Sequence, residues 1–339
     1  MKYVLGIDQG GTKTHALVGD EAGHILGVGC GAGGCHSVDG MDRAMDGVHT
    51  AVFRALAQAG INAGNIEAVA AGMTGADWPE EPALLRDALS ETLAISPGRI
   101  RVVNDCIIAL RAGTSNPMGA VLCAGTGLNC AVRDGRGGEF VFGYYIPDED
   151  QGGEALAERA LRAVFDAHTG MGPATALTRR CLEALGCDTV DALLRKKVEG
   201  GLGREARNRI PPIVGEEAQS GDAVSAELLT RLGRDMAAYV AAGIRKLGLE
   251  AEPVEVVLSG SVFKCEAPML IRSVTETVLA TAPGARIIDS TLEPAVGALL
   301  LALDDLGTDC TTDIQRHIER DAQRFNMIRN TQREKERIS

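Results

Sequence analysis

Two short turns in the sequence combine glycine with threonine, and each is suited to binding phosphate. The first comprises Gly10, Gly11, Thr12 and Lys13, followed by Thr14, and the second comprises Gly125, Thr126 and Gly127. Glycine lets backbone N–H groups approach phosphate oxygens, while threonine hydroxyls and lysine add donors and positive charge. Either turn alone is equally typical of a plain β-hairpin. Together, they predict two sides of one polyphosphate site.

Three acidic positions accompany these turns and suit different parts of a phosphoryl transfer. Asp8 ends the first apolar run, where it can hold Mg²⁺ through water, because that ion sheds its waters reluctantly. Asp105 begins an apolar helix, so it can be either a general base or only the helix cap. Asp148, beside Glu149 in YYIPDED, can bind a sugar hydroxyl or Mg²⁺, or can belong to a solvated acidic turn.

The remaining polar motifs give weaker indications. Gly260 and Ser261 end the apolar run VEVVLSG, where a purine ring could lie against the backbone. Cys35 beside His36 could suggest a thiol nucleophile, but no neighbouring group in the sequence would lower the pKa of the thiol. The sequence contains no GxxxxGK[ST], no GxGxxG after a strand, no Ser/His/Asp signature and no CxxC. Structural zinc is therefore not expected.

Length and composition restrict the class of protein. A chain of 339 residues is long enough for two domains with separate cores. Its formal net charge of −12 argues against nucleic acid or an anionic membrane as the partner. We expect no signal peptide and no membrane span, because the chain has neither a basic N-terminal region before an apolar core nor a long apolar run. Nine scattered cysteines indicate reduced thiols and a cytoplasmic location.

Hydrophobic patterning predicts the elements that position these residues. Strands are predicted at 3–7, 14–18, 24–28, 66–73, 100–103, 120–123, 129–133, 254–258 and 285–288. Helices are predicted near 39–58, 82–93, 106–112, 153–168, 174–185, 189–199, 222–247 and 293–303.

The arrangement of strand, glycine-threonine turn and strand occurs at 3–18 and returns at 120–133, which indicates a weak internal repeat. The turn-rich segment GTSNPM lies between the two copies. We therefore expect an N-terminal α/β domain at 1–115 and a C-terminal α/β domain at 116–308.

The last segment, 309–339, differs in composition and is expected to be a separate basic, polar tail. Within it, a thin apolar stripe predicts a surface helix with a frayed end. The stripe consists of Ile314, Ile318, Ala322 and Phe325.

Taken together, the motifs resemble those of the N-acetylglucosamine kinase family, which is grouped with the BadF/BadG/BcrA/BcrD ATPase-like proteins. The resemblance rests on GIDQGGTKTHALV, VVNDCIIAL, VLCAGTGLNC, DED after an aromatic stretch, EEAQSGD, VVLSGSVFK and EPAVGALLLA, in this order. It extends over residues 1–305. It implies an α/β fold of two duplicated actin-like, ribonuclease H-like domains, with an interdomain cleft for nucleotide and sugar.

The resemblance also implies roles for individual residues, with ATP and Mg²⁺ as cofactors. Asp8 belongs to the first phosphate motif and to Mg²⁺ binding, and Asp105 matches the catalytic base. The implied ATP-binding residues are Asp8, Gly10, Gly11, Thr12, Lys13, Gly125, Thr126, Gly127, Ala218, Gly260 and Ser261. The implied sugar-binding residues are Cys35, His36, Asp105, Asn129 and Asp148.

The chain departs from the family pattern on the sugar side. Cys35 stands where the family has asparagine, and Cys is a poor hydrogen-bond partner. The segment 142–145, FGYY, replaces a glycine-tryptophan-glycine stretch, and Pro147 replaces the glycine before Asp148. The ATP-side motifs match throughout. The resemblance therefore supports ATP binding more strongly than N-acetylglucosamine binding.

The resemblance implies a kinase of a sugar or amino sugar, of the N-acetylglucosamine or glucosamine type, in which Asp105 deprotonates a hydroxyl, expected to be O6. One alternative is an ATPase activator of the 2-hydroxyacyl-CoA dehydratase type, for which Cys123 is suggestive although no second cluster ligand is evident. Another is a sugar-sensing repressor, which needs a DNA-binding module, whereas the first predicted strand starts at Tyr3. A third is a catalytically degenerate ATP-binding protein. A homodimer is expected from the family alone, and the sequence names neither the sugar nor the role of the tail.

Overall fold

The computed structural model describes residues 1–265 and 267–328, which form two structural units. Among the described residues, unit 1 comprises 1–121, 135–137 and 288–328, and unit 2 comprises 122–134 and 138–287. Each unit is built around its own five-stranded sheet.

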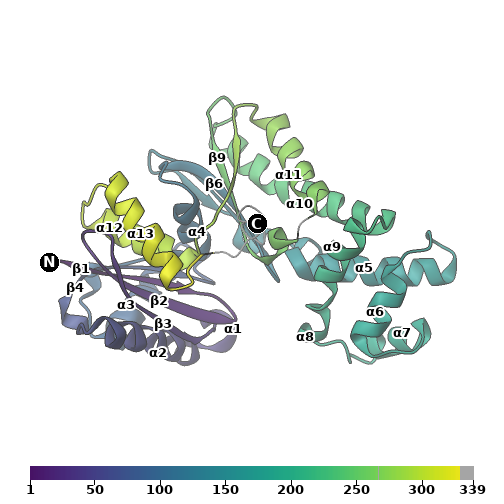
Figure 1. Cartoon of the computed structure of the whole chain (residues 1–339), viewed down its shortest axis with the longest axis horizontal. Coiled ribbons are helices and arrows are strands. Elements are labelled where there is room, and N and C mark those ends of the chain that lie inside the picture. Colours follow the sequence, from purple (N-terminus) through teal and green to yellow (C-terminus); the bar gives the residue numbers. More distant parts are fainter. Residues whose placement is uncertain (266, 329–339) are drawn as a thin grey trace. The chain divides into compact units, whose positions relative to one another are not determined.

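Unit 1 contains a mixed sheet in the order β3-β2-β1-β4-β5 (Figure 1). Its strands are β1 (Tyr3–Gln9), β2 (Lys13–Asp20), β3 (Ile25–Ala32), β4 (Ile66–Met73) and β5 (Ile100–Asn104). β2 pairs antiparallel with β1 and β3, whereas β4 pairs parallel with β1 and β5. The central strand β1 is buried from Val4 to Ile7, which explains its continuous apolar run. The strands predicted before residue 105 are all confirmed.

Helices cover both faces of this sheet (Figure 1). They are α1 (His36–Asp39), α2 (Met41–Ala59), α3 (Glu81–Leu93), α4 (Asp105–Gly113) and α12 (Pro294–Asp305). α2 packs against β2 and β3, while α12 packs against β1, β4 and α4. Glycine permits this close approach, because a Cβ at Gly6 would lie 2.3 Å from Leu299 N and one at Gly297 would lie 1.9 Å from Ile108 O.

The segment from 288 to 308 belongs to unit 1, which corrects the expected C-terminal domain of 116–308. The reason is the apolar helix α12, nearly all of whose residues are buried and which completes the core of the first sheet. An all-round apolar helix must be buried somewhere, but its sequence does not show against which sheet.

The helix predicted in the tail is confirmed as α13 (Thr312–Arg324), but this helix belongs to unit 1 and is not a separate part of the chain. Asp321 Oδ2 accepts a hydrogen bond from Ile25 N at 3.3 Å and lies 3.2 Å from His24 Nδ1. Ile318 and Ala322 of the predicted apolar stripe are buried. Residues 329–339 of the predicted tail lie outside the described residues.

Unit 2 repeats the strand order of unit 1. The strands of this second sheet, most of which lies in unit 2, are β6 (Met118–Ala124), β7 (Leu128–Asp134), β8 (Glu139–Val141), β9 (Glu255–Ser259) and β10 (Arg286–Asp289). The sheet order is β10-β9-β6-β7-β8, so β6, β7 and β8 occupy the places of β1, β2 and β3. The duplicated α/β architecture predicted from the internal repeat is therefore confirmed.

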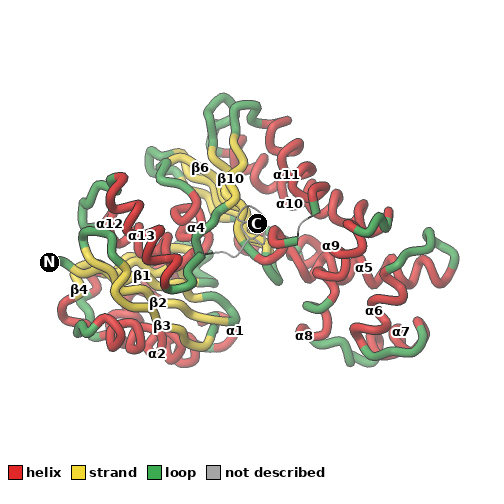
Figure 2. The backbone as a smooth tube through the Cα atoms, in the orientation of Figure 1, coloured by secondary structure: helices red, strands yellow, loops and turns green. Residues whose placement is uncertain are grey.

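A long helical segment separates β8 from β9 (Figure 2). The helices of unit 2 are α5 (Gly152–Thr169), α6 (Leu177–Leu185), α7 (Val190–Val198), α8 (Arg204–Arg207), α9 (Ile210–Gln219), α10 (Ala223–Lys246) and α11 (Pro268–Thr281). The short 3₁₀ turns η4 (Asp148–Asp150) and η5 (Ser261–Lys264) lie at predicted site residues. Within the described residues, every helix is too short or too polar to cross a membrane.

Candidate active site

The first glycine-threonine turn connects β1 to β2 and presents a bare backbone. Gly10 N donates to Lys13 O at 2.9 Å, which closes the turn, and Gly11, Thr12 and Lys13 are exposed. Apart from the adjacent residues, no heavy atom lies within 4 Å of a Cβ built at Gly11, and the backbone there is not left-handed. The fold itself therefore does not require glycine at position 11, as expected where a ligand needs the space.

Thr14 does not contribute to this surface. Its side chain is buried, and its hydroxyl donates to Ala32 O at 2.7 Å, so it secures β2 to β3. Thr12 is the exposed hydroxyl of the turn. The prediction of two available hydroxyls is therefore corrected to one.

The topology of unit 1 brings Asp8 and Asp105 to one edge of the sheet. β1, β4 and β5 run parallel, so their carboxyl ends meet, and these ends are where α/β proteins usually bind ligands. Burial raises the pKa of Asp8 to about 7, and the negative charges of Asp105 and Glu293 add to the shift. Lys13, whose Nζ lies 3.7 Å from Glu293 Oε2, opposes it.

This edge suits a bound divalent cation. Two carboxylates whose negative charges repel each other would both be stabilised by a nearby positive ion, and oxygen donors are those that Mg²⁺ prefers. Among the described residues, no group of three or more His, Cys, Asp or Glu side chains forms a protein-only metal site.

Asp105 is the first residue of α4, and the sequence left open whether it serves only as the helix cap. Asn104 is the N-cap, because its Oδ1 accepts from Cys106 N at 2.9 Å. Burial, together with the charge of Asp77, raises the pKa of Asp105 to about 6, although hydrogen bonds from Cys106 N and the Thr74 hydroxyl lower it. Asp105 is thus a half-buried carboxylate at the first helical position, and the N-cap position belongs to Asn104.

The loop between β4 and α3 links Asp105 to the predicted sugar residue His36. Asn104 Nδ2 donates to Asp77 Oδ1 at 2.8 Å, and Glu81 Oε2 accepts from Asp77 N and Trp78 N, each at 2.7 Å. Glu81 Oε1 lies 3.3 Å from His36 Nε2, and both side chains are buried. Sequence analysis missed Glu81 because its contact with His36 joins two segments that are distant in the sequence.

Cys35 lies in the same part of unit 1. Its Sγ lies 3.2 Å from Ser37 Oγ and donates weakly to Thr74 O over 3.8 Å. A Cβ at Gly75 would lie only 2.6 Å from this sulfur, so the loop packs tightly on it. Unit 1 therefore brings together Cys35, His36, Asp8 and Asp105 among its predicted site residues.

The second glycine-threonine turn lies in unit 2, between β6 and β7. Its carbonyl groups are tied to the start of α5, because Gly153 N donates to Gly125 O and Glu154 N donates to Thr126 O, each at 2.9 Å. Outside the adjacent residues, the atom nearest to a Cβ built at Gly125 is Ser261 Oγ, at 3.9 Å. At Gly125, as at Gly11, the fold leaves room for a side chain, so packing does not require glycine there.

Gly260 has a different reason to be glycine. Its φ is +108°, and a Cβ there would lie 2.1 Å from Ala124 O, so the fold alone demands glycine. Ser261 follows it and lies beside Gly125, which brings two of the predicted nucleotide segments together in unit 2. Ala218, on α9, is only 6 % exposed, so its burial offers little support for a ligand contact.

The predicted sugar residues of unit 2 surround a turn rich in carboxylates. Asp148 is exposed in η4, directly after Pro147. Asn129 Oδ1 accepts from Gly143 N at 2.9 Å, so Asn129 also braces the segment that departs from the family pattern. Tyr144 and Tyr145 in that segment are exposed.

Gln151 connects this acidic turn to the second phosphate turn, and sequence analysis did not identify it. Its Oε1 accepts from Leu128 N at 2.9 Å, and its Nε2 donates to Ile146 O at 3.0 Å. The two predicted ligand-binding segments of unit 2 are therefore joined through one side chain. A glutamine between DED and GG carries no signal for this role, because its partners are backbone groups and one of them, Leu128 N, is remote in sequence.

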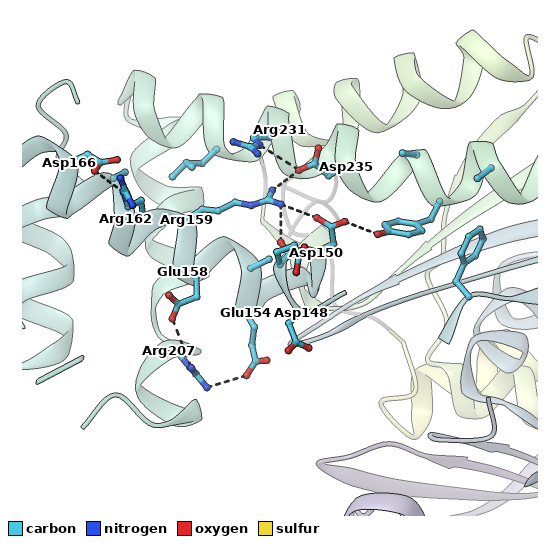
Figure 3. Close-up of a pocket in the computed structure, with 18 residues that line it drawn as sticks. Asp148, Asp150, Glu154, Glu158, Arg159, Arg162, Asp166, Arg207, Arg231 and Asp235 are labelled. Atoms are coloured by element: carbon cyan, nitrogen blue, oxygen red, sulfur yellow. Dashed lines mark hydrogen bonds and ion pairs between the residues drawn. The ribbon is translucent and has the colours of Figure 1, made fainter. Parts of the chain in front are cut away.

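A pocket of about 1380 Å³ lies beside the acidic turn, between α5 and α10; we call it the α5–α10 pocket (Figure 3). Carboxylates and arginines line it, among them Asp148, Asp150, Arg159, Asp235 and Tyr239. Arg207 pairs with Glu154 at 3.6 Å, and Arg162 pairs with Asp166 at 2.7 Å. The arginines in the pocket are thus engaged with carboxylates.

Comparison with known proteins identifies a family for most of the chain. The model of the BadF/BadG/BcrA/BcrD ATPase family matches residues 5–302. This range includes every predicted site residue and both sheets.

Individual relatives cover nearly the whole chain. An N-acetyl-D-glucosamine kinase from Dictyostelium discoideum is 28% identical over 316 residues, 88% of this chain and 97% of the relative. An N-acetylmuramic acid/N-acetylglucosamine kinase from Clostridium acetobutylicum is 25% identical over 306 residues, 89% of this chain and 98% of the relative. A crystal structure described as a candidate N-acetylglucosamine kinase from Chromobacterium violaceum has a TM-score of 0.66 at 23% identity, covering 89% of this chain and 99% of that one.

Proposed function

Because the chain belongs to the BadF/BadG/BcrA/BcrD ATPase family, we propose that it is an ATP-dependent kinase of a sugar or amino sugar. The curated relatives are kinases, which favours this function over an ATPase activator. The observation that carries the proposal is Asp105, a half-buried carboxylate at the end of a parallel strand whose capping role belongs to Asn104.

Asp105 acts as the general base in this proposal. Its carboxylate takes the proton from a sugar hydroxyl, expected to be O6, and that oxygen attacks the γ-phosphorus of ATP. The bond between the γ-phosphorus and the bridging oxygen breaks, so the products are a sugar phosphate and ADP. Asp105 then releases its proton to solvent. Phosphoryl transfer depends mainly on positioning and charge, and these are what the site residues supply.

The glycine-threonine turns of the two units bind the same triphosphate in this proposal. Backbone N–H groups of both turns, the hydroxyls of Thr12 and Thr126, and Lys13 are the donors. Mg²⁺, held by Asp8 through water, would neutralise phosphate charge. Gly260 and Ser261 lie against the adenosine of ATP in this proposal. Ala218 has the least structural support among the proposed ATP-binding residues, because it is buried.

The sugar is held by His36 and Cys35 from unit 1 and by Asn129 and Asp148 from unit 2. N-acetylglucosamine and glucosamine are the first substrates to test, because a curated relative acts on N-acetylglucosamine. The thiol of Cys35 forms weaker hydrogen bonds than an amide, and the aromatic segment before Asp148 is bulkier than glycine. These differences favour a test with several sugars.

The proposal is tested by measuring ADP release with Mg²⁺ and ATP over a panel of sugars, with ATP alone as the control. The panel contains N-acetylglucosamine, glucosamine, N-acetylmuramic acid, glucose and N-acetylmannosamine. We expect at least one sugar to stimulate ADP release and to be recovered as its phosphate. Failure of every sugar would favour a degenerate ATP-binding protein. Iron and colour in anaerobically purified protein would favour an ATPase activator.

The pH dependence of the reaction is the second test. Since the pKa of Asp105 is raised to about 6 and the base must be ionised, kcat/KM for the sugar should rise about tenfold per pH unit below that value and level off above it. The measurement is kcat/KM for the sugar at saturating Mg²⁺ and ATP, with the metal keeping Asp8 ionised. A profile that stays flat through about pH 5 to 8 would contradict the assignment of Asp105 as the base.

A cytoplasmic homodimer completes the proposal. All nine cysteines are free thiols in the structure, which supports a reducing compartment. The homodimer rests on the family alone, and sedimentation velocity of the full chain would test it.

A further inference from the structure

The turn that carries Asp148 contains three consecutive carboxylates, which differ in exposure. All three line the α5–α10 pocket, where Asp148 and Glu149 are exposed and Asp150 is half-buried. Negative charges this close repel one another, and the repulsion favours opening of the turn. A compact turn therefore needs positive charge or hydrogen-bond donors on its inner side.

Arg159 on α5 supplies both the positive charge and the hydrogen-bond donors. Its Nη2 donates to Glu149 O at 3.0 Å and to Asp150 Oδ1 at 3.2 Å. On the other side, its Nη1 lies 2.8 Å from Asp235 Oδ2 on α10 (Figure 3). A planar guanidinium can reach these partners at once because its donors are fixed in a fork, which a lysine ammonium lacks. Arg159 thus ties the turn to α5 and, through Asp235, to α10.

Tyr239 on α10 holds the second oxygen of the same carboxylate. Its hydroxyl donates to Asp150 Oδ2 at 2.7 Å, and its ring packs edge-to-face against Phe142 with centroids 5.3 Å apart. Burial and the hydrogen bond to Asp150 raise the pKa of Tyr239 above its ordinary value, so the hydroxyl stays protonated as a donor. Both oxygens of Asp150 are therefore engaged within the protein.

Because of these contacts, Asp150 and Asp148 have different roles in the turn. Asp150 is held from two helices, while Asp148, two residues earlier, is exposed in the same pocket. Gln151 directly follows and fixes the turn to Leu128 and Ile146. The structure assigns Arg159 and Tyr239 as positioning residues that act through Asp150 to hold Asp148 in place for the sugar, an assignment that rests on the proposed kinase function.

Affinity for sugar should depend on this network more than affinity for nucleotide does. A loosened turn must be ordered again when the sugar binds, and the cost appears in the sugar KM. The phosphate turn keeps its own bonds to α5 through Gly153 and Glu154, which neither substitution touches. The effect of the network is thus predicted to be selective for one substrate.

The test compares Tyr239→Phe and Arg159→Lys with the control Arg162→Lys, a residue of the same pocket and helix that pairs with Asp166. With N-acetylglucosamine as the sugar, we expect each of the first two variants to raise the sugar KM by about tenfold, the size of one lost hydrogen bond to a charged group. The KM for ATP should stay at its wild-type value. The control should leave both KM values unchanged.

Amide hydrogen exchange of residues 148–151 in the substrate-free protein gives a second readout that needs no activity. Exchange should be faster in Tyr239→Phe and Arg159→Lys than in wild type and in Arg162→Lys. Tyr239→Phe removes a single oxygen. If Arg159→Lys does not fold, Tyr239→Phe alone tests whether the network holds the turn.

Unchanged exchange in Tyr239→Phe would overturn the inference, as would an unchanged sugar KM. A parallel rise of both KM values with a lower melting temperature would also overturn it, because that pattern indicates general destabilisation. If wild-type protein phosphorylates no sugar, the kinase proposal and the role in sugar binding both fail, while hydrogen exchange still decides whether the network holds the turn.

Discussion

Replacing Asp105 with asparagine is expected to lower kcat for sugar phosphorylation by about 10²- to 10⁴-fold, the usual contribution of a general base. An amide cannot take the hydroxyl proton at neutral pH, although it has nearly the same size as the carboxylate. The start of α4 keeps its cap, because the cap is Asn104. Binding of Mg²⁺ and ATP should be retained, so steady-state kinetics together with nucleotide titration separate a lost base from a lost fold.

The same substitution should make the substrate-free protein more stable. The pKa of Asp105 is raised from 3.8 to about 6, so the folded state holds the proton more tightly than the unfolded state does. The ionised carboxylate therefore reduces stability above that pH, and Asp105→Asn should raise the free energy of unfolding at pH 8 by about 1 to 3 kcal/mol. The gain should vanish below about pH 4, where both states are protonated. Urea unfolding at the two pH values measures it, with the exposed Asp313 replaced by asparagine as control.

Wild-type turnover by Asp105→Asn would remove Asp105 from the mechanism. Loss of turnover combined with lower stability at pH 8 would instead indicate a structural role for the carboxylate.

Asp8→Asn is expected to lower kcat/KM by about 10²- to 10³-fold, because the residue that holds Mg²⁺ is lost and metal stabilisation of phosphate charge is worth several kcal/mol. The loss should shrink as the Mg²⁺ concentration is raised. ADP without metal should bind to the variant at least as tightly as to wild type, since a negative charge near the phosphates has been removed. The measurement is turnover over a series of Mg²⁺ concentrations, paired with ADP titration in the presence of EDTA.

Two outcomes would argue against Asp8 as the Mg²⁺ contact. One is a loss of activity that is the same at every Mg²⁺ concentration. The other is weaker binding of metal-free ADP. Lower stability would also be unexpected, because burial and the charge of Asp105 already raise the pKa of Asp8 to about 7 and so make its ionised form unfavourable.

Local sequence signals predicted the framework of unit 1 well. The strand at 66–73 matches β4 at both ends, because a short apolar run between a polar turn and a loop leaves few alternatives. Asp8 and Asp105 were identified because each follows an apolar strand. Their proximity follows from the parallel pairing of β1, β4 and β5, which the pattern of strands and helices suggests but which only the topology establishes.

The role of Asp105 at the helix start could not be decided from composition alone. Asn and Asp are both good N-caps, and they stand next to each other in the sequence. A one-residue difference in where the helix begins decides which side chain caps and which is left for chemistry. Helix boundaries are the least certain part of such a prediction, so the structure was needed here.

Other features depend on contacts between distant segments. α9 and α11 went unpredicted, although each has proline in its first turn, a common helix start. Glu81 and Gln151 are ordinary polar residues in the sequence, and only the fold gives them partners. The return of the chain to unit 1 after residue 288 is likewise set by the packing of α12 on β1.

The most direct test is whether both glycine-threonine turns touch one triphosphate. Titration calorimetry with Mg²⁺ and a non-hydrolysable ATP analogue would compare wild type with Gly11→Ala, Gly125→Ala and the double variant. A new methyl group fits the fold at both positions, so melting temperatures should not change. Each single variant should weaken binding by about tenfold, and the double variant by about the product of the two. Wild-type affinity in either single variant would contradict a shared phosphate site.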